Sequence, residues 1–134
     1  MMLDIKRLLE SKSLIASAGI IYTCVITVVF LMPTSGLPRV SFPGGADKPI
    51  HLLSHFILVT LWQVYWFRRN NYQLNGKQGA VLLAGSLLYG IIIEIMQACF
   101  TEGRTADLFD VIANFSGALL AVFLFSKIKY LFTP

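Results

Sequence analysis

The sequence predicts an all-α protein, a polytopic transmembrane four-helix bundle, on three observations. Of the 134 residues, 56% are hydrophobic and only 13% are charged, whereas a soluble domain carries about 25% charged residues. The mean hydropathy is +0.70. Four apolar stretches each approach the roughly 20 residues that a helix needs to cross the hydrocarbon core of a bilayer. Lipid must therefore be part of this protein's solvent.

The first apolar stretch, residues 14–32, contains no charged residue and follows the basic residues Lys6, Arg7 and Lys12. A basic segment before an apolar one is also typical of a secretory signal peptide. The stretch is longer than the usual signal peptide core, however, and no A-x-A cleavage site follows it. We therefore expect an uncleaved helix, preceded by a cytoplasmic tail over residues 1–13.

Each of the other three stretches is interrupted by a few polar residues. They cover residues 50–67 with His51, His55 and Gln63, residues 79–100 with Glu94 and Gln97, and residues 108–126 with Asp110 and Asn114. All three are too long for strands of a soluble domain and too apolar for helices on a soluble surface. We expect one membrane domain over residues 14–126, followed by a tail over residues 127–134.

Lysine and arginine are distributed unequally between the two sides of this bundle. One side, with both tails and the loop between the second and third helices, holds eight: Lys6, Arg7, Lys12, Arg68, Arg69, Lys77, Lys127 and Lys129. The other side holds Arg39, Lys48 and Arg104. Because positive residues are retained on the cytoplasmic side, we expect both termini in the cytoplasm.

The two outer loops differ in composition. Residues 33–49 are rich in proline and glycine, which predicts an irregular segment. Asp47, at its end, is a suitable cap for the second helix, since Pro49 is tolerated in a first turn. Residues 101–107 form a short connection, so the third and fourth helices should be antiparallel neighbours.

The polar residues within the helices fall on shared faces. Gly90, Glu94 and Gln97 follow i, i+4, i+7 spacing on the third helix. Asp110 and Asn114 lie one turn apart on the fourth. At a rise of 1.5 Å per residue, Glu94 lies roughly 13 Å below the outer turn.

Almost all of the strongly polar intramembrane residues occupy the outer half of the bundle. Gln63 is the exception. Ionisable groups in a bilayer are costly and usually face the interior of a bundle. The pattern therefore predicts a polar pocket that opens outward. Its expected members are Asp47, Lys48, His51, Glu94, Gln97, Arg104, Asp110 and Asn114.

Structural explanations for these residues also stand. Asn114 and Gln97 could form only hydrogen bonds between helices. Glu94, Arg104 and Asp110 could form an ion network that only holds the bundle together, and His55 could simply pack in the core. A buried Glu94 needs a partner, and Arg104 and Lys48 are the cations near the outer helix ends.

Four function classes remain after composition is considered, one of them a purely structural or accessory role. The leading hypothesis is a binding module that recognises an amphiphile at the outer leaflet, without a cofactor or a bound metal. The alternative is a membrane-embedded enzyme in which Glu94, Asp110 and His51 act as acid–base or metal-binding groups, or in which His51, His55 and Glu94 bind a metal. A transporter is less consistent with four helices, which offer little room for alternating access unless the chain oligomerises. Nucleic-acid binding is excluded, since no basic patch occurs on a polar domain.

Several of these residues match the motifs of a known family. The sequence Asp47-Lys48-Pro49-Ile50-His51 matches Asp-Lys-x-x-His before a helix. The other matches, in chain order, are Gly90, Glu94 and Gln97, then Arg104, and then Asp110, Asn114 and Gly117. Over residues 32–125, the chain thus resembles the VanZ-like family of small bacterial membrane proteins. It departs from the common pattern in carrying Pro49 within the first motif and an additional histidine, His55.

The resemblance implies a location in the bacterial cytoplasmic membrane and a role in the cell envelope. The namesake of the family is associated with low-level resistance to the glycopeptide antibiotic teicoplanin, so the resemblance implies either resistance of that type or an envelope housekeeping role. The expected partners are membrane lipids and a lipid-linked cell-wall precursor or a lipidated glycopeptide.

Overall fold

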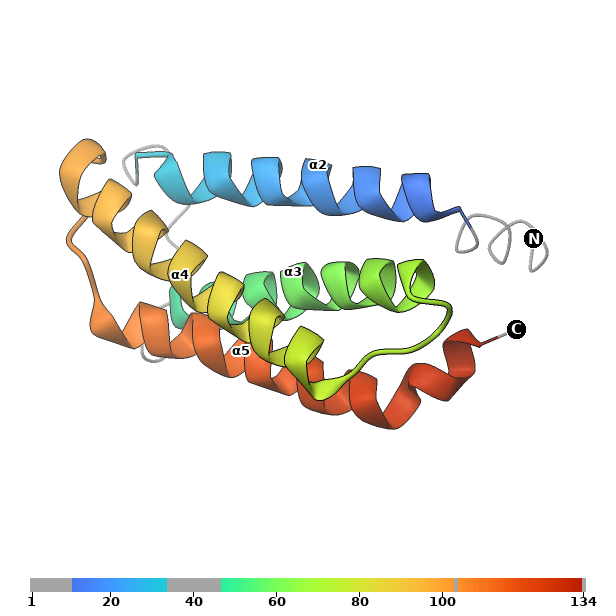
Figure 1. Cartoon of the computed structure of the whole chain (residues 1–134). Coiled ribbons are helices and arrows are strands. Elements are labelled where there is room, and N and C mark those ends of the chain that lie inside the picture. The colour runs from blue at the N-terminus through green and yellow to red at the C-terminus, as the bar shows by residue number, and fades with distance from the viewer. Residues whose placement is uncertain (1–10, 34–46, 103, 134) are drawn as a thin grey trace.

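The computed structural model describes residues 11–33, 47–102 and 104–133, which form four long helices (Figure 1). These are α2 (Lys12–Leu31), α3 (Asp47–Arg69), α4 (Gly76–Phe100) and α5 (Leu108–Ile128), and α5 continues into a short 3₁₀ helix, η2 (Lys129–Phe132). The described residues contain no strand. Each of the four helices is long and apolar enough to cross a membrane, which confirms the all-α, four-helix prediction.

The helices extend beyond the apolar stretches that predict them, because polar residues at a membrane surface can still belong to a helix. α3 includes Asp47 at its start and Arg69 at its end. Asp47 lies within the first turn of α3 and not before it, so the expectation that it caps this helix is wrong. The residues before Asp47 lie outside the described part of the chain. α4 begins after Asn75, whose side chain accepts from the Gln78 backbone N–H while Gln78 bonds back to the Asn75 N–H. This reciprocal cap fixes the start of α4.

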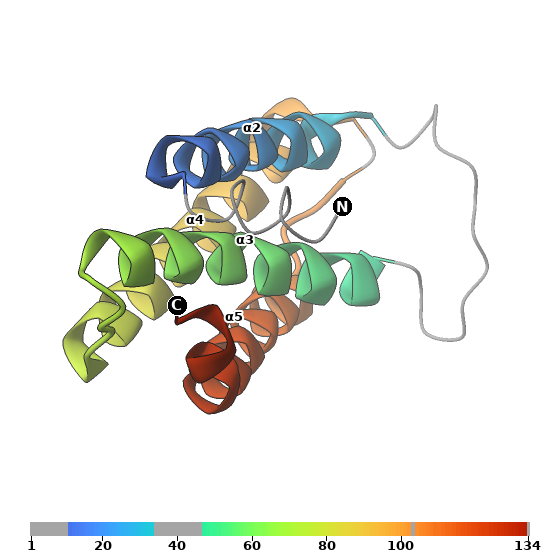
Figure 2. The same ribbon diagram turned by 90° about the vertical axis from the view of Figure 1, so that its right-hand side faces the viewer.

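α3 is the central helix and contacts the other three (Figures 1 and 2). Its interface with α5 is the most extensive. There Gly117 lies directly against the α3 backbone, and a Cβ at this position would overlap with the carbonyl oxygen of Leu52. A small residue at Gly117 therefore allows the close approach of the two helices.

Apolar side chains fill the space between the helices and also cover the outside. Ile26, Phe30, Leu58 and Ile93 form a buried cluster between α2, α3 and α4, and Val59, Ala118 and Ala121 form another between α3 and α5. Many large apolar residues are exposed on the outside, among them Ile21, Val28 and Phe123. An outer surface of this kind suits contact with lipid tails.

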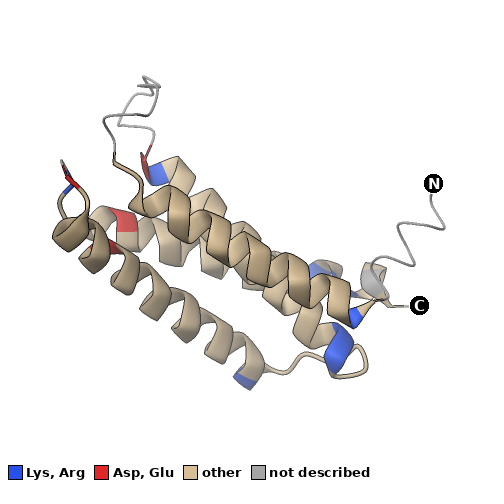
Figure 3. Cartoon of the chain, turned by 90° about the horizontal axis from the view of Figure 1, so that it is seen from above, with Lys and Arg blue, Asp and Glu red and all other residues tan. Residues whose placement is uncertain are grey.

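The charged residues gather at the two ends of the bundle, and the acidic ones lie at one end only among the described residues (Figure 3). The start of α2, the α3–α4 turn and the end of α5 lie at one end, which we term the basic end. Its described charged residues are all basic: Lys12, Arg68, Arg69, Lys77, Lys127 and Lys129. The opposite end, which we term the acidic end, holds all the acidic residues that the structure describes: Asp47, Glu94, Glu102, Asp107 and Asp110.

The α3–α4 turn at the basic end is compact. Asn71 and Tyr72 adopt positive φ angles of 51° and 61°, which few residues other than glycine do. The backbone N–H of Tyr72 donates to the Phe67 carbonyl over 2.8 Å, and Nη1 of Arg68 donates to the Tyr72 hydroxyl over 2.8 Å. These contacts hold the unusual backbone conformation in place.

Candidate functional site

Three helices bring four polar side chains together near the acidic end. α3 contributes His51, α4 contributes Glu94, and α5 contributes Asp110 and Asn114. As whole residues, backbone included, the four are between 0% and 8% exposed. Because Asp110 and Asn114 are one helical turn apart, both point to the same side of α5, and the close contact of α3 with α5 at Gly117 sets them against His51. We term these four residues the polar cluster.

His51 is the centre of the polar cluster. Its Nδ1 lies 3.1 Å from Oδ1 of Asn114 and 3.8 Å from Oε1 of Glu94. Its Nε2 lies 3.7 Å from Oδ2 of Asp110. The imidazole thus has a carboxylate near each of its nitrogens, an arrangement that can hold, accept or release a proton.

The plane of the His51 ring is fixed from the α2 side. Phe30 stacks on it with 4.5 Å between ring centroids and 7° between the planes. Nε2 of Gln97 in turn donates to the backbone carbonyl of Phe30 over 2.8 Å. Gln97 therefore ties the end of α2 to α4 and positions the aromatic ring that covers His51.

Glu94 and Asp110 are both connected to the start of α5. The backbone N–H of Asp107 donates to Oε2 of Glu94 over 3.1 Å. Nζ of Lys48 lies 3.4 Å from Oδ2 of Asp107 and 4.0 Å from Oδ1 of Asp110. Asp107 also caps α5, since its Oδ1 accepts from the Phe109 backbone N–H over 2.8 Å. That hydrogen bond, with a smaller contribution from Lys48, lowers the pKa of Asp107.

The exposure of the side chains decreases stepwise from the surface to the centre of the cluster. It is 44% for Lys48, 12% for Asp110, 4% for Glu94 and 1% for His51. A continuous line of polar groups therefore runs from the acidic end of the bundle down to His51, between helices that are otherwise apolar.

The polar cluster has unused hydrogen-bonding capacity. Oε1 of Glu94, Oδ1 of Asp110 and Nδ2 of Asn114 are buried and make no hydrogen bond within the described part of the chain. Buried polar atoms in proteins are almost always bonded. Two of the three are carboxylate oxygens, so the cluster is suited chiefly to a group that donates hydrogen bonds or carries positive charge.

The family resemblance of the sequence motifs is supported by a match to a protein-family model. Residues 39–132 match the VanZ/LLP1 family model. The chain belongs to the VanZ-like family. No curated protein and no solved structure matches the chain. In this VanZ-like protein, the matched residues include all four members of the polar cluster.

Five of the eight residues expected in a pocket meet at or beside the polar cluster of this VanZ-like protein. They are Lys48, His51, Glu94, Asp110 and Asn114. The expected proximity of Glu94 and Asp110 is confirmed, since the oxygen atoms that they would offer to a metal lie within 4.8 Å of each other.

The other three expected residues are placed differently. Gln97 bonds to the α2 backbone rather than to the cluster. Asp47 is exposed at the start of α3. Arg104, which could have been the partner of Glu94, forms no ion pair with it, and its Nε makes no hydrogen bond within the described residues. The described contacts of Glu94 are instead the Asp107 N–H and His51.

His55 does not join His51 in a shared set of ligands. Its Nδ1 lies 2.7 Å from Oγ of Ser86, and its ring lies against Tyr89 with 5.6 Å between centroids. The residues whose ligand atoms gather within 4.8 Å are His51, Glu94 and Asp110. The expected set of His51, His55 and Glu94 is therefore wrong in one member: His55 bonds to Ser86, and Asp110 is the third residue of the set.

Two residues beside the cluster were not anticipated from the sequence. Asp107 connects Glu94, Lys48 and the start of α5, and an aspartate directly before an apolar stretch is a recognised signal for a helix cap. Phe30 stacks on His51, but an aromatic residue within an apolar stretch gives no signal that distinguishes it from its neighbours.

Proposed function

We propose that this VanZ-like protein binds the polar headgroup of an envelope-related amphiphile at the outer surface of the cytoplasmic membrane. The observation that carries the proposal is the pair of buried carboxylate oxygens, on Glu94 and Asp110, that lack hydrogen-bond donors within the described residues. An amine or hydroxyl group of a headgroup would supply such donors.

Charge supports a headgroup with donors or a positive charge. Even with His51 protonated, this residue and Lys48 bring two positive charges to three carboxylates, those of Glu94, Asp107 and Asp110. The excess of negative charge disfavours a purely anionic headgroup. Lipid-linked cell-wall precursors and lipidated glycopeptides carry amines and hydroxyl groups together with apolar chains, so that the helices around the cluster would contact the chains.

The orientation of the chain is part of the same proposal. Six described lysine and arginine residues lie at the basic end, against two, Lys48 and Arg104, at the acidic end. The positive-inside rule favours the basic end in the cytoplasm. The polar cluster then faces outward, where envelope precursors and glycopeptides occur, which is also the setting of teicoplanin resistance or of a housekeeping role in the envelope.

Native mass spectrometry of the protein purified from its own membrane tests this function. The wild type should retain an amphiphile, and Glu94→Gln should lose it because the variant keeps the shape of the side chain but removes its charge. Glu102→Gln is the matched control, since Glu102 is an exposed carboxylate at the same end of the bundle. Equal retention by wild type and Glu94→Gln, or no retained amphiphile at all, would contradict the proposal.

A second candidate function, a metal-dependent or acid–base enzyme, is supported by a separate observation. One ligand atom each from His51, Glu94 and Asp110 lies within 4.8 Å of the other two. Ligand atoms around Zn²⁺ lie about 2.0–2.2 Å from the metal, so small side-chain rotations would bring the three onto one divalent cation. Elemental analysis of wild type, Glu94→Gln and Asp110→Asn distinguishes this candidate: a stoichiometric divalent cation in the wild type alone would support it.

A further inference from the structure

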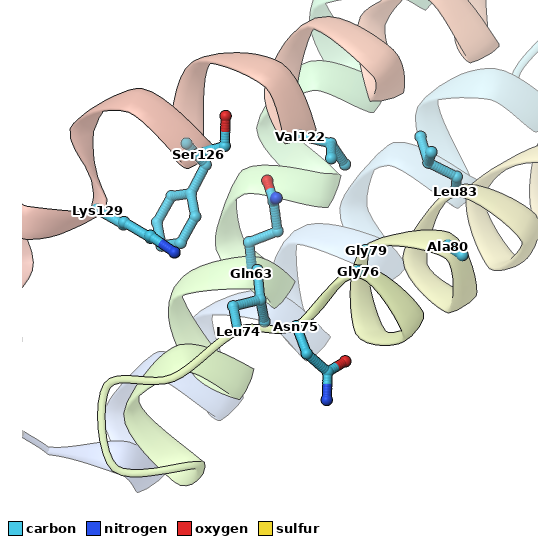
Figure 4. Close-up of a pocket in the computed structure, with 11 residues that line it drawn as sticks. Gln63, Leu74, Asn75, Gly76, Gly79, Ala80, Leu83, Val122, Ser126 and Lys129 are labelled. Carbon is cyan, nitrogen blue, oxygen red and sulfur yellow. The ribbon is translucent and has the colours of Figure 1, made fainter.

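A cavity of about 310 Å³ lies at the basic end, between α3, α4 and α5 (Figure 4). Its walls are largely apolar and include Leu74, Leu83 and Val122. It is at the opposite end of the bundle from the polar cluster, so an explanation of the cluster does not account for it. Its volume falls within the range of about 300–1,000 Å³ that is common for small-molecule sites.

The floor of this cavity carries one polar side chain, the amide of Gln63. Figure 4 shows the amide reaching from α3 toward Val122 of α5. The side chain is 0% exposed, and neither its Oε1 nor its Nε2 has a hydrogen-bond partner within the described residues. A leucine would fill the same space without the cost of desolvating an amide. An amide that faces an apolar cavity without a hydrogen bond indicates a ligand with an apolar body and a polar group that hydrogen-bonds to the amide.

The opening of the cavity is polar and basic. A second hollow of about 380 Å³ adjoins it and shares Leu74, Asn75 and Lys129 with it. Amide side chains line this hollow further, among them Gln73 and Gln78. Lys129 forms no ion pair within the described residues, and none of the described residues at this end is acidic. The entrance therefore favours an anion.

We propose that the two hollows together bind one anionic phospholipid from the membrane leaflet at the basic end. Lys129 and the neighbouring amides contact the phosphate, and the Gln63 amide donates to an ester carbonyl below it. The first part of an acyl chain lies against Leu83 and Val122. The order of these contacts follows the order of groups in a phospholipid: charged head, esters, then chain. This site does not depend on the function of the polar cluster.

Native mass spectrometry with added phosphatidylglycerol and phosphatidylcholine of identical chains tests the proposal. The wild type should retain phosphatidylglycerol in preference to phosphatidylcholine. Lys129→Gln should reduce this preference about five-fold, because one lysine at a membrane surface contributes on the order of 1 kcal/mol to attraction of anionic lipid. Lys127→Gln is the matched control, since it removes the same charge from a residue that does not line either hollow.

Gln63→Leu tests the ester contact separately. It should lower the retention of both lipids, while the thermal midpoint of the protein stays the same or rises. Glycerol 3-phosphate, which has no acyl chains, should not displace the lipid, whereas displacement by it would identify a free phosphate site instead. Equal losses in Lys129→Gln and Lys127→Gln would show general surface attraction and overturn the proposal, as would retention by Gln63→Leu at the wild-type level.

Discussion

The α carbon of Gly117 lies so close to the α3 backbone that a Cβ on it would overlap with the Leu52 carbonyl oxygen and come within 2.9 Å of the carbonyl carbon. Backbone atoms cannot rotate away as a flexible side chain can. The absence of a side chain at Gly117 allows α5 to lie this close to α3, and the polar cluster is assembled nearby from side chains on both helices.

Gly117→Ala should therefore destabilise the protein by about 1–3 kcal/mol, since the added methyl group forces α3 and α5 apart. The thermal midpoint in detergent measures the change. Gly85→Ala is the control, because a Cβ at Gly85 meets no atom within 4 Å. In that variant the midpoint should stay constant or rise, as alanine is the better helix former by roughly 1 kcal/mol. Equal midpoints for wild type and Gly117→Ala would refute the close contact.

Ser86→Ala should destabilise the protein by about 1–3 kcal/mol, because it removes the partner of His55 Nδ1 and leaves a fully buried imidazole without a hydrogen bond. Ser116→Ala provides the comparison. Ser116 is exposed and bonds only to the carbonyl of Ile112 in its own helix, so its loss should change stability by less than about 0.5 kcal/mol. If both variants unfold at the same temperature, the His55–Ser86 bond does not stabilise the bundle.

Asp107 should make stability depend on pH in the acidic range. Its pKa is lowered from 3.8, first by the Phe109 N–H and then by Lys48. A carboxyl group whose pKa is lower in the folded state than in the unfolded state stabilises the fold at pH values above the unfolded-state pKa. This stabilisation is lost as the pH falls through the folded-state pKa. The wild type should thus unfold at a higher temperature than Asp107→Asn at pH 6, and the difference should shrink below pH 3.8.

Asn is itself a good helix cap, so Asp107→Asn removes the charge that faces Lys48 while largely preserving the start of α5. Lys48→Gln should reproduce part of the loss at pH 6, because it removes the same ion pair from the other side. A difference between wild type and Asp107→Asn that is independent of pH would exclude the carboxylate as its cause.

The orientation of the chain leads to a prediction about accessibility. With the basic end in the cytoplasm, a reporter that works only in the cytoplasm should be active when it is fused after residue 134. A reporter that works only outside the cytoplasm should be active when it is inserted within residues 40–46. The reverse pattern would place the polar cluster at the inner surface and would contradict the proposed access from the outer leaflet.

The sequence alone determined the fold class, since apolar stretches of membrane-spanning length leave the chain few alternatives to four helices. It also determined which residues share a helical face, because the helical period is fixed: Asp110 with Asn114, and Glu94 with Gln97. These faces also predict that Glu94 and Asp110 meet.

Only the tertiary structure decided which groups bond to one another. Glu94 receives the Asp107 N–H instead of pairing with Arg104, Gln97 turns to the α2 backbone, and His55 bonds to Ser86. The sequence equally gave no sign that Gln63 would face a cavity. The helical period determines on which face of its own helix a side chain lies. Its partner depends on how far the helices slide and rotate against each other, and contacts such as the one between Gly117 and Leu52 fix that geometry.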